Sequence, residues 1–117
     1  SDTQTLHKAG KKENKVMKIT TLSAAHKVPF DLEGYIMHKS NILEVIHICL
    51  QTGESIALHK NEFDVVVCLI KGEVTLLTNE KQVKLGLYCV AEIGKEAQRG
   101  FINHGTDEAR LLILKKI

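Results

Sequence analysis

Hydrophobic residues in this chain come in short runs, not at the three- and four-residue spacing of an amphipathic helix. The runs are rich in valine, isoleucine and threonine, residues that favour β-strands. We expect each run to form a strand. The runs cover residues 16–22, 35–39, 42–50, 55–58, 63–70, 73–78, 81–85, 87–93 and 109–117.

Residues that favour turns separate these runs. Regular short strands with turns between them are typical of an antiparallel sandwich or barrel, so we predict an all-β fold. A single helical turn is expected around Ser23 to Lys27, where Ser23 can cap it and Pro29 ends it. The turn signals are Gly34, Gly53, Gly72, Thr78-Asn79-Glu80, Gly86 and Gly105.

The first residues differ in composition from the rest of the chain. Residues 1–15 are polar and rich in lysine, so we expect a flexible basic leader followed by one domain over residues 16–117. The net charge of +2 is small, and no aromatic side chain stands among these lysines to stack on bases. We therefore expect no nucleic-acid partner.

The composition is that of an ordinary globular protein, with 44% hydrophobic and 26% charged residues. No run approaches the roughly 18 apolar residues of a membrane span, so no membrane partner is expected. The polar start lacks the apolar segment of an export signal, and we expect a cytoplasmic location. Cys49, Cys68 and Cys89 are widely spaced and are expected to be free thiols.

Two of the runs are apolar at almost every position. Residues 42–50 and 65–70 offer apolar side chains to both faces of a sheet, so one face packs into the barrel and the other needs a second cover. Because large apolar patches are seldom left exposed, we expect a homodimer.

The spacing of glycines and polar residues carries a family resemblance over residues 40–114. Gly53, His59 and Gly72 stand at the positions of a first motif, and Gly86 and Gly94 at those of a second motif. The second motif ends in Gly100, Phe101 and Asn103. In this pattern the chain resembles the cupin superfamily, in particular small single-domain RmlC-like cupins. The resemblance implies a jelly-roll barrel, also called a double-stranded β-helix.

The resemblance also shows what this chain lacks. Typical cupins hold a divalent metal ion on three histidines and a glutamate, but Asn61 and Val65 stand here in place of the second histidine and the glutamate. The third histidine is replaced by Ala97 or by Arg99, depending on the register, and the sequence leaves both registers open. Neither residue coordinates a metal, so we expect no metal and no cofactor.

The same positions predict a ligand pocket. Along an extended strand alternate side chains face one side, which here is the barrel interior. Arg99 joins them if it points inward, whereas the other interpretation pairs it with Glu92 or Glu96 on the surface. An inward arginine favours a small organic ligand that carries a carboxylate or a phosphate. The pocket candidates are His59, Asn61, Val65, Val67, Leu69 and Arg99.

These features favour a metal-free module that binds or senses a small molecule. One alternative is a cupin-type enzyme whose metal site is rebuilt from His59 and another histidine. Another is a metal-free isomerase with His59 as base and Tyr88 as acid, and a third is a structural domain whose output is its dimer surface. The sequence does not decide whether the protein is an enzyme.

Overall fold

The computed structural model describes residues 17–117, and the predicted leader over residues 1–15 lies outside the described residues. The described part forms one short 3₁₀ helix and ten strands, so the predicted all-β class is confirmed. The elements are η2 (Leu22–Ala24), β1 (His26–Lys27), β2 (Glu33–Lys39), β3 (Leu43–Leu50), β4 (Ser55–His59), β5 (Val65–Lys71), β6 (Val74–Leu77), β7 (Gln82–Leu85), β8 (Val90–Ile93), β9 (Arg99–Ile102) and β10 (Ala109–Lys116).

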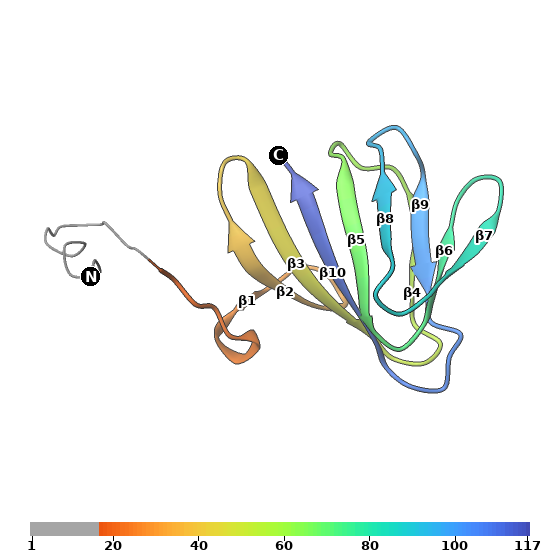
Figure 1. Cartoon of the computed structure of the whole chain (residues 1–117), viewed down its shortest axis with the longest axis horizontal. Helices are drawn as coiled ribbons and strands as arrows, with labels where there is room; N and C mark the ends of the chain where they lie inside the picture. The colour runs from red at the N-terminus through yellow and green to blue at the C-terminus, as the bar shows by residue number, and fades with distance from the viewer. Residues whose placement is uncertain (1–16) are drawn as a thin grey trace, which may run out of the picture.

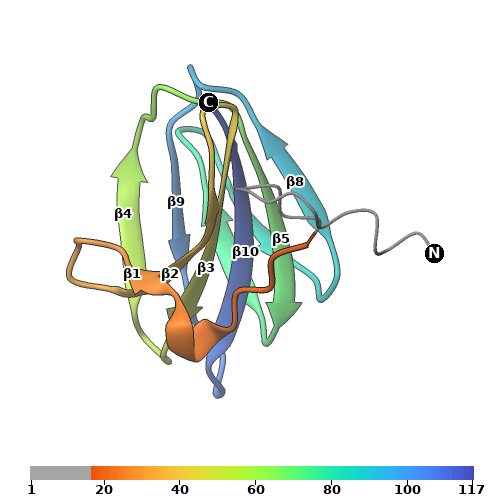
Figure 2. The same ribbon diagram turned by 90° about the vertical axis from the view of Figure 1, so that its left-hand side faces the viewer.

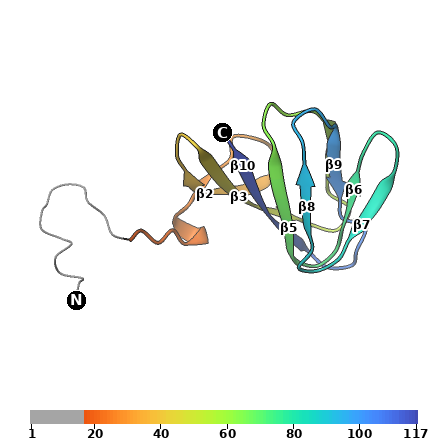
Figure 3. The same cartoon turned by 45° about the horizontal axis from the view of Figure 1, so that its top comes forward.

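The strands form two antiparallel sheets. The larger sheet has the order β1-β2-β3-β10-β5-β8, and the smaller sheet has the order β4-β9-β6-β7. Figure 1 shows β2, β3, β10 and β5 side by side, and the view tilted by 45° keeps β10 between β3 and β5 (Figure 3). In the view turned by 90°, β4 and β9 lie on one side, with β10, β5 and β8 on the other (Figure 2).

The core lies between the two sheets and follows the two-residue alternation of the strands. Along β5 the side chains of Val65, Val67 and Leu69 are buried, whereas those between them are partly exposed. Each such side chain contributes about 1.5–3 kcal/mol when it is fully removed from water. The buried cluster comprises Ile48, Leu50, Val65, Val67, Leu69, Val74, Leu76, Leu85, Ile93, Phe101, Ala109 and Leu111.

Gly72 joins β5 to β6, and two features require glycine there. Its φ angle is +75°, a left-handed conformation that other residues rarely adopt. A Cβ atom at this position would also lie 2.6 Å from the carbonyl oxygen of Glu108. The glycine that closes the first sequence motif therefore lets the chain turn tightly against the segment before β10.

Two expectations about local structure are corrected, and one strand had not been expected. The run over residues 16–22 is not a strand at residues 17–21, where the side chains of Met17 and Ile19 are exposed. The helical turn is a 3₁₀ turn at Leu22–Ala24, after which the chain enters β1. Strand β9 was not among the predicted runs.

Within residues 17–117 no helix has the length and apolar character needed to cross a bilayer.

Candidate functional site

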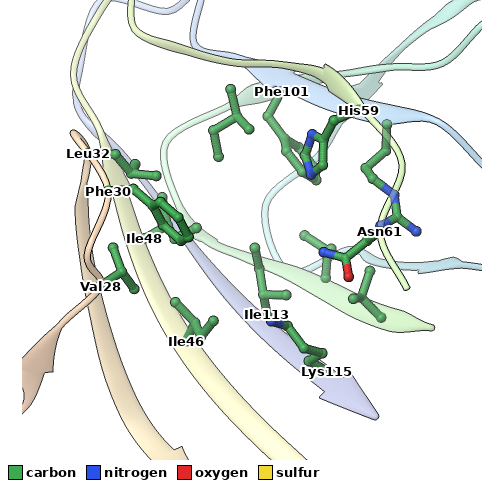
Figure 4. Close-up of a pocket in the computed structure, with 14 residues that line it drawn as sticks. Val28, Phe30, Leu32, Ile46, Ile48, His59, Asn61, Phe101, Ile113 and Lys115 are labelled. Atoms are coloured by element: carbon green, nitrogen blue, oxygen red, sulfur yellow. The ribbon is translucent and has the colours of Figure 1, made fainter. Parts of the chain in front are cut away.

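A cavity of about 450 Å³ lies between the sheets at the end of the barrel where β4 ends and β5 and β9 begin. This volume is within the range of pockets that hold small organic ligands. Figure 4 shows Val28, Phe30 and Leu32 across the cavity from Asn61, with Ile113 and Lys115 on β10. The lining residues are Val28, Phe30, Leu32, Ile46, Ile48, Ile56, His59, Asn61, Val65, Val67, Arg99, Phe101, Ile113 and Lys115.

The structure brings most of the predicted pocket residues together. His59, Asn61, Val65, Val67 and Arg99 all line this cavity. Leu69 does not: it lies on the same face of β5 but farther along the strand, where it is 0% exposed in the core. Alternation placed Leu69 on the correct face but could not show where the cavity ends and solid packing begins.

His59 is the last residue of β4 and lies at the exposed mouth of the cavity. A β-bulge lies between Ile56 and His59, and both residues line the cavity although they are three positions apart. The ring atom Nδ1 lies 2.8 Å from the carbonyl oxygen of Ala57. Because a carbonyl oxygen only accepts, Nδ1 carries the proton. In the neutral ring Nε2 then has a free lone pair.

Arg99 is the first residue of β9, and its direct partner across the sheet is His59. Its side chain lines the cavity and the residue is only 2% exposed. Atom Nη2 donates a 2.8 Å hydrogen bond to the carbonyl oxygen of Gly94, whereas the buried Nε has no acceptor. Burial lowers the pKa of Arg99 and the nearby Asp64 raises it, but a guanidinium stays charged at neutral pH.

These contacts settle two alternatives that the sequence left open. Arg99 points inward and makes no ion pair with Glu92, Glu96 or any other carboxylate of residues 17–117. Ala97 is exposed in the turn before β9, where its N–H donates to the carbonyl oxygen of Gly94. Arg99 is therefore the residue that stands beside His59.

The close pairing of β4 with β9 depends on the next residue, Gly100. A Cβ atom there would lie 2.7 Å from the carbonyl oxygen of Ile56 and 2.9 Å from the backbone nitrogen of Leu58. Glycine thus lets the backbones approach closely and holds Arg99 and Phe101, its two neighbours, against the cavity.

The sequence analysis missed Lys115, the one further charged residue in the lining. Its Nζ lies 3.2 Å from Oε1 of Glu44 and 5.4 Å from the ring centre of Phe63. Alternation could have found it, because Ala109, Leu111, Ile113 and Lys115 share the inward face of β10. The segment from Val28 to Leu32, which adds an apolar wall, carried no comparable signal.

The side chains at this place do not fit a divalent metal ion. His59 supplies one imidazole, Asn61 one amide, and Val65 has no donor atom, while the cation of Arg99 has no lone pair and repels another cation. Among residues 17–117 there is no group of three or more histidine, cysteine or acidic side chains that could hold a metal.

The alternative pairing of His59 with Tyr88 is not formed either. Tyr88 is 75% exposed in the turn between β7 and β8 and does not line the cavity. The Nδ1 atom of His59 donates to a backbone carbonyl and not to a carboxylate that would orient and strengthen a base.

His47 lies on the outer face of the larger sheet, where its Nε2 is 3.0 Å from Nη1 of Arg110.

No protein-family model matches the chain, and no curated protein matches it by sequence. Solved structures match it closely in shape. The protein TT1209 from Thermus thermophilus is 24% identical, with a TM-score of 0.72 over 86% of this chain and 97% of that protein. A predicted oxalate decarboxylase from Thermotoga maritima is 16% identical, with a TM-score of 0.77 over 86% and 99% of the two chains.

A third structure is an RmlC-like cupin family protein from Methanocaldococcus jannaschii with a double-stranded β-helix fold. It is 17% identical to this chain, with a TM-score of 0.74 over 87% of this chain and 92% of that protein. The structural similarity establishes a shared fold. At identities this low it carries no activity from one protein to another.

Proposed function

Because this chain has the cupin fold, a double-stranded β-helix, we propose that the cavity between its sheets binds a small organic molecule with an anionic group and needs no metal to do so. The protein then acts as a binding or sensing module. The observation that carries this proposal is Arg99, a cation that is 2% exposed, faces an apolar cavity and forms no salt bridge with a carboxylate of residues 17–117, although the nearby Asp64 raises its pKa.

A buried charge without a salt bridge is costly. The desolvation penalty for one ion in a protein is several kcal/mol, and an opposite charge with good hydrogen bonds offsets it. Arg99 has one backbone acceptor, Gly94, and a buried Nε without any. An anionic ligand would supply the missing acceptor, and arginine forms paired hydrogen bonds with carboxylates and phosphates.

The rest of the cavity supports an organic ligand and not an inorganic ion. Apolar side chains make up most of its wall, and few polar groups converge at the end where β4 and β9 meet. This arrangement, an apolar cleft with a few placed polar groups, is typical of small-molecule sites. The cytoplasmic location expected from the sequence remains part of this proposal.

A thermal-shift screen with organic acids tests the proposal. A ligand at one hundred times its dissociation constant stabilises the folded protein by about 2.7 kcal/mol. We expect acids with an apolar body to raise the melting temperature of the native protein and not that of Arg99→Met, which keeps a side chain of similar length without charge. A screen in which no acid shifts the native protein, or in which both proteins shift equally, contradicts the proposal.

We also propose that the outer face of the larger sheet binds a second copy of the chain. Half-buried aliphatic side chains cover this face in β3, β5 and β10. These aliphatic side chains form a strip, and acidic and basic side chains border it. In a dimer with a two-fold axis, the acidic border residues of one copy can therefore lie against the basic ones of the other. The strip consists of Val45, Val66, Ile70, Leu112 and Leu114, and its charged border of Glu33, Glu92, Arg110 and Lys116.

Sedimentation equilibrium tests this assembly. The chain has a mass of 13.1 kDa, so the native protein should sediment at twice that mass, whereas Leu112→Glu, which puts a charge at the centre of the strip, should sediment as a monomer. A native protein that remains monomeric at high micromolar concentration rules out the dimer.

A further inference from the structure

The charges in the cavity lining favour a ligand with one net negative charge. Lys115 also lines it, but Glu44 already neutralises its ammonium group at 3.2 Å. Among residues 17–117, Arg99 is the one cation of the lining that forms no salt bridge, since Asp64 is near enough to raise its pKa but does not pair with it. A carboxylate carries a single charge and balances it, whereas a phosphate monoester carries about 1.5 to 2 negative charges at neutral pH and would leave an excess in an apolar cavity.

Beside this cation stands a hydrogen-bond acceptor. Nδ1 of His59 donates to Ala57, so in the neutral ring Nε2 accepts. His59 and Arg99 are direct partners across β4 and β9, and such partners have Cα atoms only about 4.5–5.5 Å apart. One compact group of a ligand can therefore contact both side chains: its anionic part binds Arg99 and its hydrogen-bond donor binds His59.

The remainder of the wall suits an apolar body. Phe30, Ile48, Phe101 and Ile113 line the cavity from both sheets and from the segment before β2. Phe30 is exposed at the mouth although it lines the cavity, so an entering ring or branched chain gains contact area with it.

From these three features we infer that the ligand is an α-hydroxy monocarboxylate with an aromatic or branched apolar body. Its carboxylate binds Arg99, its hydroxyl group donates to Nε2 of His59, and its apolar body fills the space between the sheets. This inference rests on the proposed function, because it names the class of ligand for the same cavity.

Calorimetric titration with four compounds that share a phenyl ring tests it: phenyllactate, phenylpropanoate, phenylethyl phosphate and phenylpropanol. Both carboxylates should bind at least about tenfold more tightly than the alcohol, and more tightly than the phosphate. Phenyllactate should bind about threefold to tenfold more tightly than phenylpropanoate, the usual effect of one hydrogen bond. His59→Ala should abolish that preference, and Arg99→Met should reduce both acids to the level of the alcohol.

The outcomes separate the two proposals. If the phosphate binds as tightly as the carboxylates, or if phenyllactate has no preference that depends on His59, the inferred ligand class is wrong while the anion-binding cavity stands. If none of the anions binds more tightly than the alcohol, the proposed function itself fails. Arg99→Gln serves as a second variant, and near-ultraviolet circular dichroism checks that each variant is folded.

Discussion

His59 and Arg99 are direct partners across β4 and β9, so that a ring with a free acceptor in its neutral form and a buried cation without a salt bridge stand side by side at one cavity. A metal centre would need several donors that converge on one point. This pair instead offers one acceptor and one set of donors, which is the arrangement that recognises a polar organic group.

Arg99→Met should make the ligand-free protein more stable. The substitution removes a buried cation that forms no salt bridge and keeps an unbranched side chain in the same space, so we expect a gain of about 1–3 kcal/mol in the free energy of unfolding. Urea unfolding of both proteins measures the difference. A loss of stability would show that the guanidinium is well compensated in the free protein and would remove the reason for an anionic ligand.

The metal content of the purified protein should be far below one ion per chain. One imidazole beside a guanidinium does not retain a divalent transition metal against water. Elemental analysis of the native protein and of His59→Ala should give the same low values for iron, manganese, nickel, copper and zinc. One equivalent of metal that disappears in His59→Ala would refute this expectation.

Asn103 should be important for stability and not for binding. Its fully buried side chain donates to the carbonyl oxygens of Leu50 and Asp107, each at 2.9 Å, and accepts from the N–H of Gly105 at 2.8 Å. Asn103→Ala leaves these groups without their partner and should cost at least about 2 kcal/mol.

Asn103→Asp should cost as much or more, although it has almost the same shape. It replaces the donating nitrogen with an oxygen that faces two carbonyl oxygens, and it adds a buried charge. Chemical denaturation of the two variants measures both losses. If Asn103→Asp were as stable as the native protein, the assigned direction of these hydrogen bonds would be wrong.

Glu108 should make stability depend on acid pH. Hydrogen bonds from Arg110, then from Lys71, hold the pKa of its carboxyl group down to about 2, against 4.5 in the unfolded chain. A carboxyl group whose pKa is lowered by folding stabilises the protein fully above its unfolded pKa, and this stabilisation is lost as the pH falls toward the folded pKa.

Glu108→Gln should therefore be less stable than the native protein at neutral pH, and the difference should shrink between about pH 4.5 and about pH 2. Unfolding midpoints across that range measure it. Lys84→Gln is a suitable control, because Lys84 pairs with Glu73 at 3.4 Å on the exposed surface of the other sheet and should matter little. A difference between Glu108→Gln and the native protein that stays constant with pH would contradict the prediction.

Much of the fold could be predicted from the sequence because the strands follow simple alternation. Val65, Val67 and Leu69 face the core as their two-residue spacing predicts. Strand β9 was missed because Arg99 and Gly100 interrupt any apolar run, although Gly100 is required for the close approach of β9 to β4. Residues 17–21 were predicted as strand because their side chains favour β-structure. Such a preference does not show whether a neighbouring strand is there to pair with them.

The candidate site was harder to predict than the fold. The spacing of motif glycines brought out His59, and the distance from Asn103 brought out Arg99. Counting from Gly86 and Gly94 gave Ala97 instead, so the sequence could not decide which of the two stands beside His59. Only the register of β4 against β9 decides that. Alternation along β10 places Lys115 on the inward face, but no local pattern brings the segment with Phe30 to the same cavity.

The most direct test of the account uses the two arginines of the sequence, Arg99 and Arg110. In isotope-labelled protein each gives one side-chain Nε–H signal, and that of Arg110 is an internal control because its Nε already donates to Glu108 at 2.8 Å. On titration with phenyllactate we predict that the Arg99 signal shifts to saturation while that of Arg110 stays in place. An Arg99 signal that does not move while phenyllactate binds elsewhere would contradict the central claim.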